Sequence, residues 1–181
     1  MVVLIILERI IMRFFWGGDL ERMKISWIAW DKALASIESG GLGIGSLKAQ
    51  NIAMLGKWWW RYRVNPNSAW TEVIKSLYRA DGGFTRPTVA RRKSGCWGVI
   101  ASIPKILEKD NVPFVDHFHS VNIADVPGAV KWSWDLEPSG VYYVASLRKC
   151  IDMEILPLSD SKWMWNSLGE SFMVGFQYWL I

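Results

Sequence analysis

The 181-residue sequence has little cysteine and no long apolar run, and both shortages exclude classes of protein. Cys96 and Cys150 are its only cysteines, which excludes a disulfide framework and favours a reduced, intracellular setting. The apolar run at the start ends at Leu7, before Glu8 and Arg9, so it is too short to cross a bilayer, and no basic region precedes it as in a signal peptide. We therefore expect a protein of the nucleus or the cytoplasm that is not secreted.

Residue patterns for catalysis and for metal binding are also lacking. The sequence holds no adjacent pair of aspartates and no Gly-x-Ser-x-Gly nucleophile elbow. His117 and His119 could face one zinc ion from an extended segment, but a structural zinc site takes about four ligands, and only Cys96, Cys150 and scattered carboxylates remain. We interpret both histidines as surface residues, and we expect neither a metal nor another cofactor in this chain, nor a small-molecule substrate.

Tryptophan and positive charge, by contrast, are abundant. There are 13 tryptophans, so we expect many rings to be partly exposed or covered by a partner. Residues 1–95 carry fifteen Lys and Arg against seven Asp and Glu, whereas residues 96–181 carry six against ten. A basic block interleaved with aromatic rings suits a polyanion, because cations neutralise phosphates while rings stack on bases. A solvated basic face without a partner explains the charge equally well.

The glycine-rich segment from Gly40 to Gly45 matches neither template for a phosphate-binding loop. A P-loop requires lysine after its last glycine, where this sequence has Ser46, and the glycine spacing is not that of a dinucleotide-binding loop. Glycine permits positive φ and close approach of the backbone. We therefore interpret the segment as a structural loop that Leu42 and Ile44 anchor against the helix that follows.

Hydrophobic periodicity and turn residues predict a mainly α-helical fold with a small β-hairpin, that is, the α+β class. Helices are expected over residues 2–15, 47–62, 69–78, 97–109 with an interruption at Pro104, and 145–151. The hairpin is expected around the turn from Pro138 to Gly140, and residues 111–129 are expected to form an irregular connection.

The helix predicted over residues 47–62 carries both apolar and basic side chains. A helical projection places one set on a common face, which we expect to pack: Leu47, Asn51, Met54, Leu55, Trp58 and Tyr62. Lys57 and Arg61 lie on the flank of that face, where they could contact a nucleic-acid backbone, and Trp60 points nearly opposite. Burial in an interdomain core is the alternative for the tryptophans, and it is favoured more for Trp58 and Trp59 than for Trp60.

Four blocks of sequence, in this order and spacing, resemble plant LINE-type (non-long-terminal-repeat) retroelement reverse transcriptases: RFFWGG, KISWIAWDKA, GGLGI and NIAMLGKWWWR, within residues 13–61. A later stretch, WSWDLEPSGVYYVASLRKCID over residues 132–152, looks like the opening of the reverse-transcriptase zinc-binding domain of that family. The motif residues that we expect to be structural are Trp16, Gly17, Gly18, Trp30, Gly40, Gly41, Gly43, Asn51, Trp58, Trp132, Trp134 and Gly140.

The resemblance implies a truncated multi-domain fragment that begins after the polymerase palm. It divides the chain into a helical thumb and connection over residues 1–80, a basic loop and irregular linker over 81–129, the start of the zinc-binding domain over 130–157, and a divergent, irregular tail over 158–181. In the family, paired aspartates in the palm hold Mg²⁺, and cysteines and a histidine of the zinc-binding domain hold Zn²⁺; this chain has no match to either set.

The implied function is that of a non-catalytic fragment of an RNA-directed DNA polymerase, inactive alone, whose ancestral role is to grip the template–primer. Its expected partners are RNA or an RNA/DNA hybrid, bound without sequence preference, and the missing palm and zinc-binding domains; no membrane partner is expected. The candidate nucleic-acid-binding residues are Lys57, Trp60, Arg61, Arg63, Arg91, Arg92 and Lys93. Two alternatives remain: an orphan fragment that folds poorly and has no function, and a membrane-surface protein that uses its apolar start and basic middle.

Overall fold

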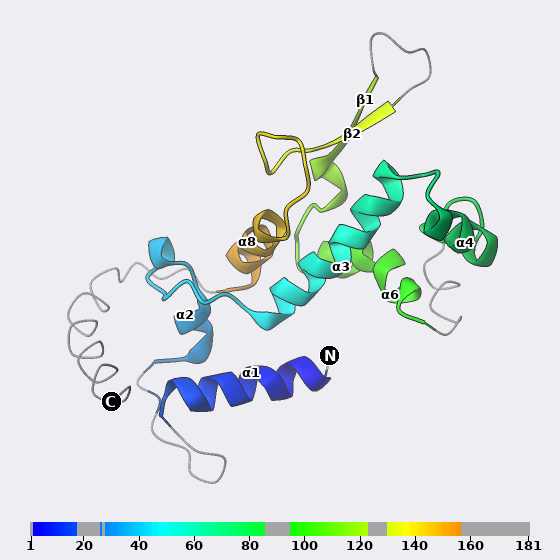
Figure 1. Cartoon of the computed structure of the whole chain (residues 1–181). Helices are drawn as coiled ribbons and strands as arrows, with labels where there is room; N and C mark the ends of the chain where they lie inside the picture. The colour runs from blue at the N-terminus through cyan, green and yellow to red at the C-terminus, as the bar shows by residue number, and fades with distance from the viewer. Residues whose placement is uncertain (1, 18–25, 27, 86–94, 123–129, 157–181) are drawn as a thin grey trace, which may run out of the picture. The chain divides into compact units, whose positions relative to one another are not determined.

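The computed structural model describes residues 2–17, 26, 28–85, 95–122 and 130–156 (Figure 1). The α-helices of these residues are α1 (Val2–Phe15), α2 (Trp30–Leu34), α3 (Leu47–Val64), α4 (Ala69–Tyr78), α6 (Trp97–Ala101), α7 (Ile103–Lys109) and α8 (Val144–Ile155). Two strands, β1 (Phe118–Asn122) and β2 (Val130–Trp134), form one antiparallel sheet. The predicted fold class, mainly helical with a small sheet, is confirmed; the tail predicted to be irregular lies outside the described residues.

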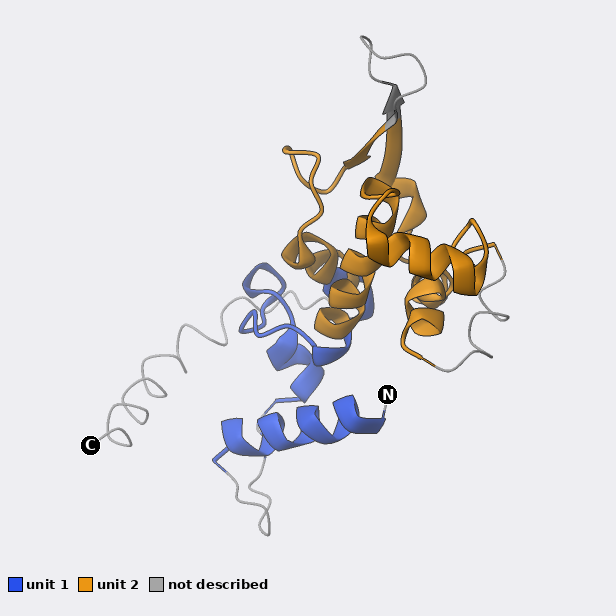
Figure 2. Cartoon of the chain, turned by 45° about the vertical axis from the view of Figure 1, so that its right-hand side comes forward, with its two compact units in different colours: residues 1–48, 152–181 blue, residues 49–151 orange. Residues whose placement is uncertain are grey.

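The chain divides into two compact units, which are described in turn (Figure 2). Unit 1 consists of residues 1–48 and 152–181, and unit 2 consists of residues 49–151. This division is based on contacts in the folded chain. The four segments predicted above are based on the resemblance to a protein family, so their boundaries stay a prediction.

The glycine-rich loop of unit 1 is tied to the short helix α2. Backbone N–H groups of Gly41, Leu42, Gly43 and Gly45 donate to the backbone carbonyls of residues 33–36 over 2.7–3.0 Å. Gly40, Gly43 and Gly45 have φ values of 77°, 71° and 74°, which L side chains adopt at a cost. The hydrogen bonds of the loop thus tie it to α2 and the two residues after it, which agrees with a structural loop. The anchoring of Leu42 and Ile44 against α3 stays a prediction.

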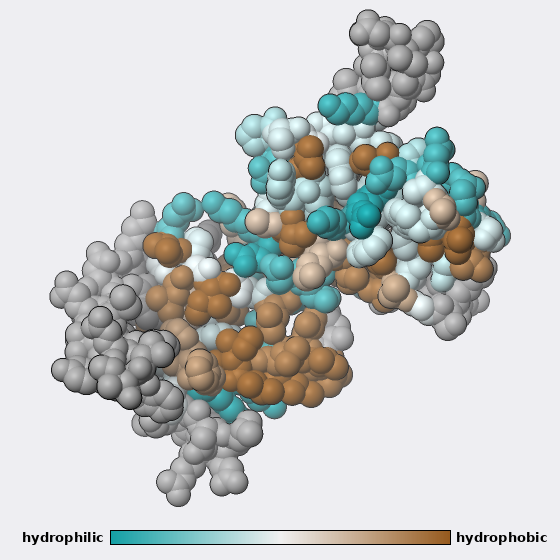
Figure 3. Space-filling view, in the orientation of Figure 1, coloured by the Kyte–Doolittle hydropathy of each residue, from teal (hydrophilic) through white to brown (hydrophobic). Residues whose placement is uncertain are grey.

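Helix α1 of unit 1 is apolar on its outer side. The carboxylate of Glu8 accepts the N–H of Leu47 at 3.4 Å, so this charged residue faces its own unit. Several apolar side chains are turned to solvent, including Val2 at 70% and Phe14 at 74% exposure. Figure 3 shows them as a continuous brown surface over α1. A surface of this kind usually marks a contact with another molecule or a site of aggregation.

Helix α3 runs through unit 2 and packs through a stripe of small residues. Ala49, Ile52, Ala53 and Gly56 are buried, and they continue into Trp59, Trp60 and Tyr62. A Cβ atom at Gly56 would lie 2.8 Å from the Tyr142 hydroxyl, so glycine lets the two segments approach closely. The predicted packing face was partly wrong: Tyr62 is buried, but Met54 and Trp58 are 55% and 43% exposed. The buried side of α3 instead follows the small residues and continues into Trp59 and Trp60.

Aromatic rings form the core of unit 2. Trp59, Phe114, Phe118, Trp134 and Tyr142 contact one another through ring centroids 4.7–6.1 Å apart, and all five are buried. The Tyr142 hydroxyl donates to the Ala53 carbonyl at 2.6 Å, and burial raises the pKa of this phenol. Four of the described tryptophans are buried, namely 59, 60, 97 and 134. Trp58, Trp70 and Trp132 of this unit are partly exposed, as expected for many of the rings, whereas the four buried rings are covered by the unit's own residues.

The sheet differs from the predicted hairpin in its pairing. Strand β2 pairs with β1, so that Phe118 lies opposite Trp134 and Ser120 opposite Trp132. The turn at Gly140, where φ is 67°, does not join two strands; it leads towards α8 instead. The connection predicted to be irregular over 111–129 thus contains strand β1. Its pairing with β2 could not be predicted from the residues of a short turn.

The loop after α4 is organised by Asp81. Its carboxylate accepts the backbone N–H groups of Gly83 and Thr85, both at 3.1 Å. A hydrogen bond from the Thr85 side chain, with help from these backbone groups, holds the pKa of Asp81 below its ordinary value of 3.8. The same loop covers Tyr62, whose hydroxyl donates to the Ala80 carbonyl at 3.1 Å. Loss of the Asp81 carboxylate should therefore loosen the covering of Tyr62.

We expect Asp81→Ala to lower the free energy of unfolding by about 1 kcal/mol near neutral pH, because two N–H groups lose a partly exposed acceptor. Since the pKa is lower in the folded state, this stabilisation is complete above the unfolded-state pKa and is lost as the pH falls through the folded-state pKa. Thermal melts of wild type and variant should therefore converge below pH 3.8. Asp81→Asn keeps one acceptor, so its stability near neutral pH should lie between those of wild type and Asp81→Ala. If wild type remains more stable than Asp81→Ala in strong acid, the stabilisation does not come from the Asp81 carboxylate.

Candidate nucleic-acid interface

The outward edge of α3 brings together two cations and one aromatic ring. Lys57, Trp58 and Arg61 are exposed, because the small-residue stripe turns the opposite side of the helix into the core. Lys57 and Arg61 lie one helical turn apart, about 6 Å along the axis. Of the residues proposed from the sequence, these two cations are therefore placed where a polyanion could reach them.

The ring of Trp58 is held in place from two sides. The Arg61 guanidinium carbon lies 4.7 Å from the centre of the Trp58 ring. The Trp70 ring of α4 meets the Trp58 ring at 85°, with centroids 5.8 Å apart. A cation–π contact at an exposed site is worth about 0.5–1 kcal/mol, enough to favour one arrangement of these side chains. The edge is thus a pre-arranged group of one ring and one cation, with Lys57 beside them.

Trp60 and Arg63 lie elsewhere than predicted. Trp60 is 8% exposed and its ring contacts those of Phe118 and Tyr142, so it is not available to stack on a base. The Arg63 guanidinium lies within 4.8–5.3 Å of three ring centres, those of Trp59, Phe84 and Trp132. Burial lowers the pKa of Arg63, and its Nε atom has no hydrogen-bond partner among the described residues. Its main contacts are therefore with the aromatic core.

The other candidate binding residues and several of the structural motif residues fall into three groups. Gly18, Arg91, Arg92 and Lys93 lie outside the described residues. Trp16 and Trp30 both belong to unit 1, where Phe15 contacts each ring, with centroids 5.1 and 5.6 Å apart, and Gly17 follows α1 with a φ of 65°. Asn51 is exposed on α3, and the interface does not involve it.

The two histidines make different contacts. His117 packs its ring against Trp134 at 5.6 Å, and its Nε2 atom is buried without a hydrogen-bond partner among the described residues. His119, on β1, is exposed and pairs with the carboxylate of Asp135. The interpretation of both as surface residues holds for His119 only. In the described part of the chain, no group of three or more His, Cys, Asp and Glu residues could hold a metal ion.

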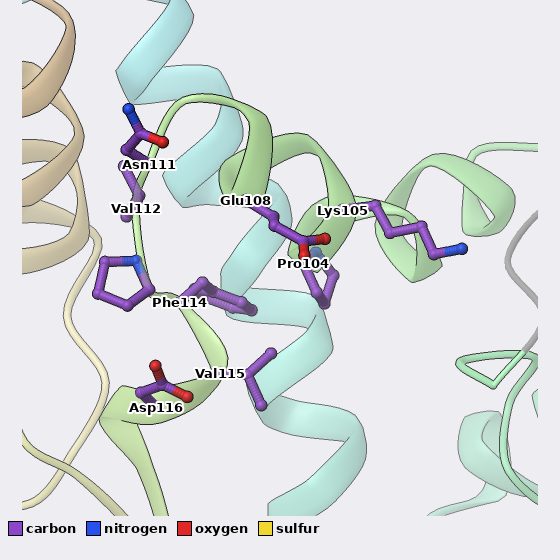
Figure 4. A pocket seen from close by; sticks show the side chains of 9 residues that line it. Pro104, Lys105, Glu108, Asn111, Val112, Phe114, Val115 and Asp116 are labelled. Carbon is purple, nitrogen blue, oxygen red and sulfur yellow. The ribbon is translucent and has the colours of Figure 1, made fainter.

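A groove of about 430 Å³ lies beside α7 in unit 2 (Figure 4). Its lining includes Lys105, Glu108 and Asp116, together with apolar groups such as Phe114 and Val115. Figure 4 shows Lys105 extending away from the two carboxylates. Since the carboxylates would repel phosphates, this groove suits a polyanion less well than the edge of α3.

Comparison with known proteins gives two partial matches. The chain is 33% identical over 72 residues to a candidate ribonuclease H protein of Arabidopsis thaliana, covering 40% of this chain and 12% of that protein. It is 31% identical over 97 residues to an uncharacterized mitochondrial protein of Arabidopsis thaliana, covering 53% of this chain and 63% of that protein. The matches thus span less than two thirds of either relative. No protein-family model matches the chain, and no solved structure matches it significantly.

The aromatic part of the interface was missed in the sequence. Trp58 was assigned to the packing face, whereas it is exposed, and Trp70 was not considered. The available signal was the spacing of Ala49, Ala53 and Gly56, which marks a close helix contact on the other side. Small residues at intervals of three and four are a better guide to this face than the large apolar ones.

Proposed function

We propose that the chain is a remnant of a plant LINE-type retroelement reverse transcriptase, comprising the thumb and connection after the palm and the start of the zinc-binding domain. The partial similarity to a candidate ribonuclease H protein supports such an origin, because ribonuclease H acts on RNA–DNA hybrids, the nucleic acid that a reverse transcriptase holds. The four sequence blocks within residues 13–61 carry the more specific assignment.

The proposed activity is non-catalytic binding of nucleic acid without sequence preference. The observation that carries it is the exposed group of Lys57, Trp58 and Arg61 on one edge of α3. Lysine and arginine neutralise phosphates whatever the base sequence. No polymerase step is assigned to this chain, since its sequence has no adjacent aspartates that could hold the two metal ions.

Further partners follow from the proposed origin. A palm domain and the rest of a zinc-binding domain would complete the enzyme, and the Mg²⁺ and Zn²⁺ of the family belong to those parts. RNA or an RNA/DNA hybrid would be bound in the nucleus or the cytoplasm. The basic segment with Arg91, Arg92 and Lys93 would add to the charge available for binding.

Binding should weaken steeply with salt. If Lys57 and Arg61 each neutralise one phosphate, the affinity should fall about tenfold between about 50 mM and 200 mM salt, because released counterions drive binding. Filter binding of a labelled RNA/DNA hybrid and of its RNA strand measures this directly. An affinity that does not change with salt contradicts the proposal.

One structural feature supports a second candidate function, at a membrane surface. The outer side of α1 exposes Val3, Ile6 and Ile10 at 67%, 50% and 44%, and Arg9 beside them is exposed. A helix with such a side can lie on a bilayer. Among the described residues, no helix combines the length and the hydrophobicity needed to cross a membrane. Flotation with anionic liposomes distinguishes the two candidates, since a nucleic-acid-binding remnant should stay with the soluble fraction.

A poorly folding fragment without function is the other alternative. The connected aromatic core of unit 2 opposes it, because buried rings give a folded state that is lost as a whole. Circular dichroism during heating should show one cooperative transition for this unit; a gradual loss of helix signal favours the poorly folding fragment.

A further inference from the structure

Trp58 lies outside the buried core of unit 2. It is the exposed member of the run Trp58-Trp59-Trp60, with 43% of its surface open, while its two neighbours are buried. Its described ring contacts are the edge contact with Trp70 and the cation contact with Arg61. A large ring left in water is usually used in binding.

From this arrangement we infer that Trp58, Arg61 and Lys57 form a stacking site for an unpaired nucleotide base, so that the chain prefers single-stranded nucleic acid to a duplex. This inference rests on the proposed function and names its substrate class. Trp58 offers a π surface, and the guanidinium of Arg61, 4.7 Å from the ring centre, offers a second planar group on which a base can stack.

Base pairing decides which nucleic acid can use such a site. In a duplex, the faces of the bases are covered by their neighbours, and only their edges are open in the grooves. A single strand can turn a base outward onto an aromatic ring, and stacking of this kind accepts every base. The ring of Trp58 therefore adds affinity for a single strand and adds little for a duplex.

The neighbours of Trp58 prepare the site for binding. Trp70 meets the ring at 85° and Arg61 lies over it, so little side-chain freedom remains to be lost when a base arrives. Lys57, one residue before the ring, can neutralise a phosphate next to the stacked base, and Arg61 can do the same on the following turn. The charges of both cations would also attract a duplex. The preference for a single strand over a duplex therefore comes from the ring and not from the charge.

The test compares Trp58→Ala and Trp58→Phe in the full chain. Fluorescence anisotropy is measured with a labelled mixed-sequence RNA of about 12 nucleotides, alone and annealed to complementary DNA. We expect Trp58→Ala to weaken binding of the single strand about tenfold or more and to change hybrid binding by less than about threefold. Trp58→Phe, which keeps a π surface, should retain most of the single-strand affinity.

A control variant and the salt response separate the possible failures. Met54→Ala alters a 55% exposed residue one turn before Trp58, and it should leave both affinities unchanged. If Trp58→Ala weakens both probes equally or neither, while wild-type binding still falls with salt, the stacking site is wrong and the proposed function stands. If wild type binds neither probe, both are wrong.

Discussion

Replacing Trp134 with alanine is expected to lower the free energy of unfolding by about 3–5 kcal/mol, the usual range for removing a buried aromatic ring. Trp134 is fully buried, and its ring lies 4.7 Å from that of Phe118 and 5.0 Å from that of Tyr142. It also joins β2 to α8, since its indole N–H donates to the Ser146 hydroxyl at 3.0 Å. The substitution therefore leaves a cavity where strand, helix and turn meet.

Two matched variants separate the ring from its hydrogen bond. Ser146→Ala removes only the acceptor and should cost about 1 kcal/mol. Trp134→Phe keeps an aromatic ring and should cost less than Trp134→Ala. Urea unfolding followed by circular dichroism gives all three values. A loss below about 1 kcal/mol for Trp134→Ala contradicts the position of this ring at the centre of unit 2.

Gly41→Ala is expected to destabilise unit 1 by about 3 kcal/mol or more, because the added methyl group collides with backbone that cannot move away. A Cβ atom at Gly41 would lie 2.1 Å from the carbonyl oxygen of Ala35 and 2.7 Å from that of Lys32. Relief would require breaking the hydrogen bonds that tie the loop to α2. A loop built to bind phosphate would not need this contact.

Gly43→Ala is the matched control for Gly41→Ala. At Gly43 the nearest atom to an added Cβ is a side-chain carbon of Ile37 at 3.4 Å, so the cost is mainly that of a φ of 71°. We expect a loss of about 1 kcal/mol there. Hydrogen exchange of the loop amides reports on both variants, and equal exchange in the two would contradict the close contact at Gly41.

Local sequence signals predicted most of the helices. The helix predicted over residues 69–78 coincides with α4, because Asn65, Pro66 and Asn67 break the chain before it and its apolar residues repeat with helical period. Pro104 divides the helix predicted over 97–109 into α6 and α7, since proline is accepted in the first turn of a helix. Such signals depend only on residues close together in the sequence, so these helix boundaries could be predicted from the sequence alone.

The errors concern contacts between distant segments. Which side of α3 is buried depends on Phe114, Tyr142 and Leu147, all far from α3 in sequence, because Gly56 leaves room for them. The pairing of β1 with β2 likewise depends on Phe118 and Trp134 meeting in one core. Periodicity alone gives two candidate faces for a helix with tryptophan at three successive positions. Because of that ambiguity, Trp60 was predicted to bind nucleic acid and Trp58 to pack, whereas Trp60 is buried and Trp58 is exposed.

The most direct test of binding through α3 is the salt dependence of single-stranded RNA binding by Lys57→Ala/Arg61→Ala, compared with Lys105→Ala/Lys109→Ala. Both double variants lose two exposed cations, the first pair from α3 and the second from α7, so the net charge of the chain stays matched. We expect the slope of log affinity against log salt to become less steep by about 1.4 for the α3 variant, and to stay at the wild-type value for the α7 variant. Equal slopes for the two variants, or no binding by wild type, would contradict the account.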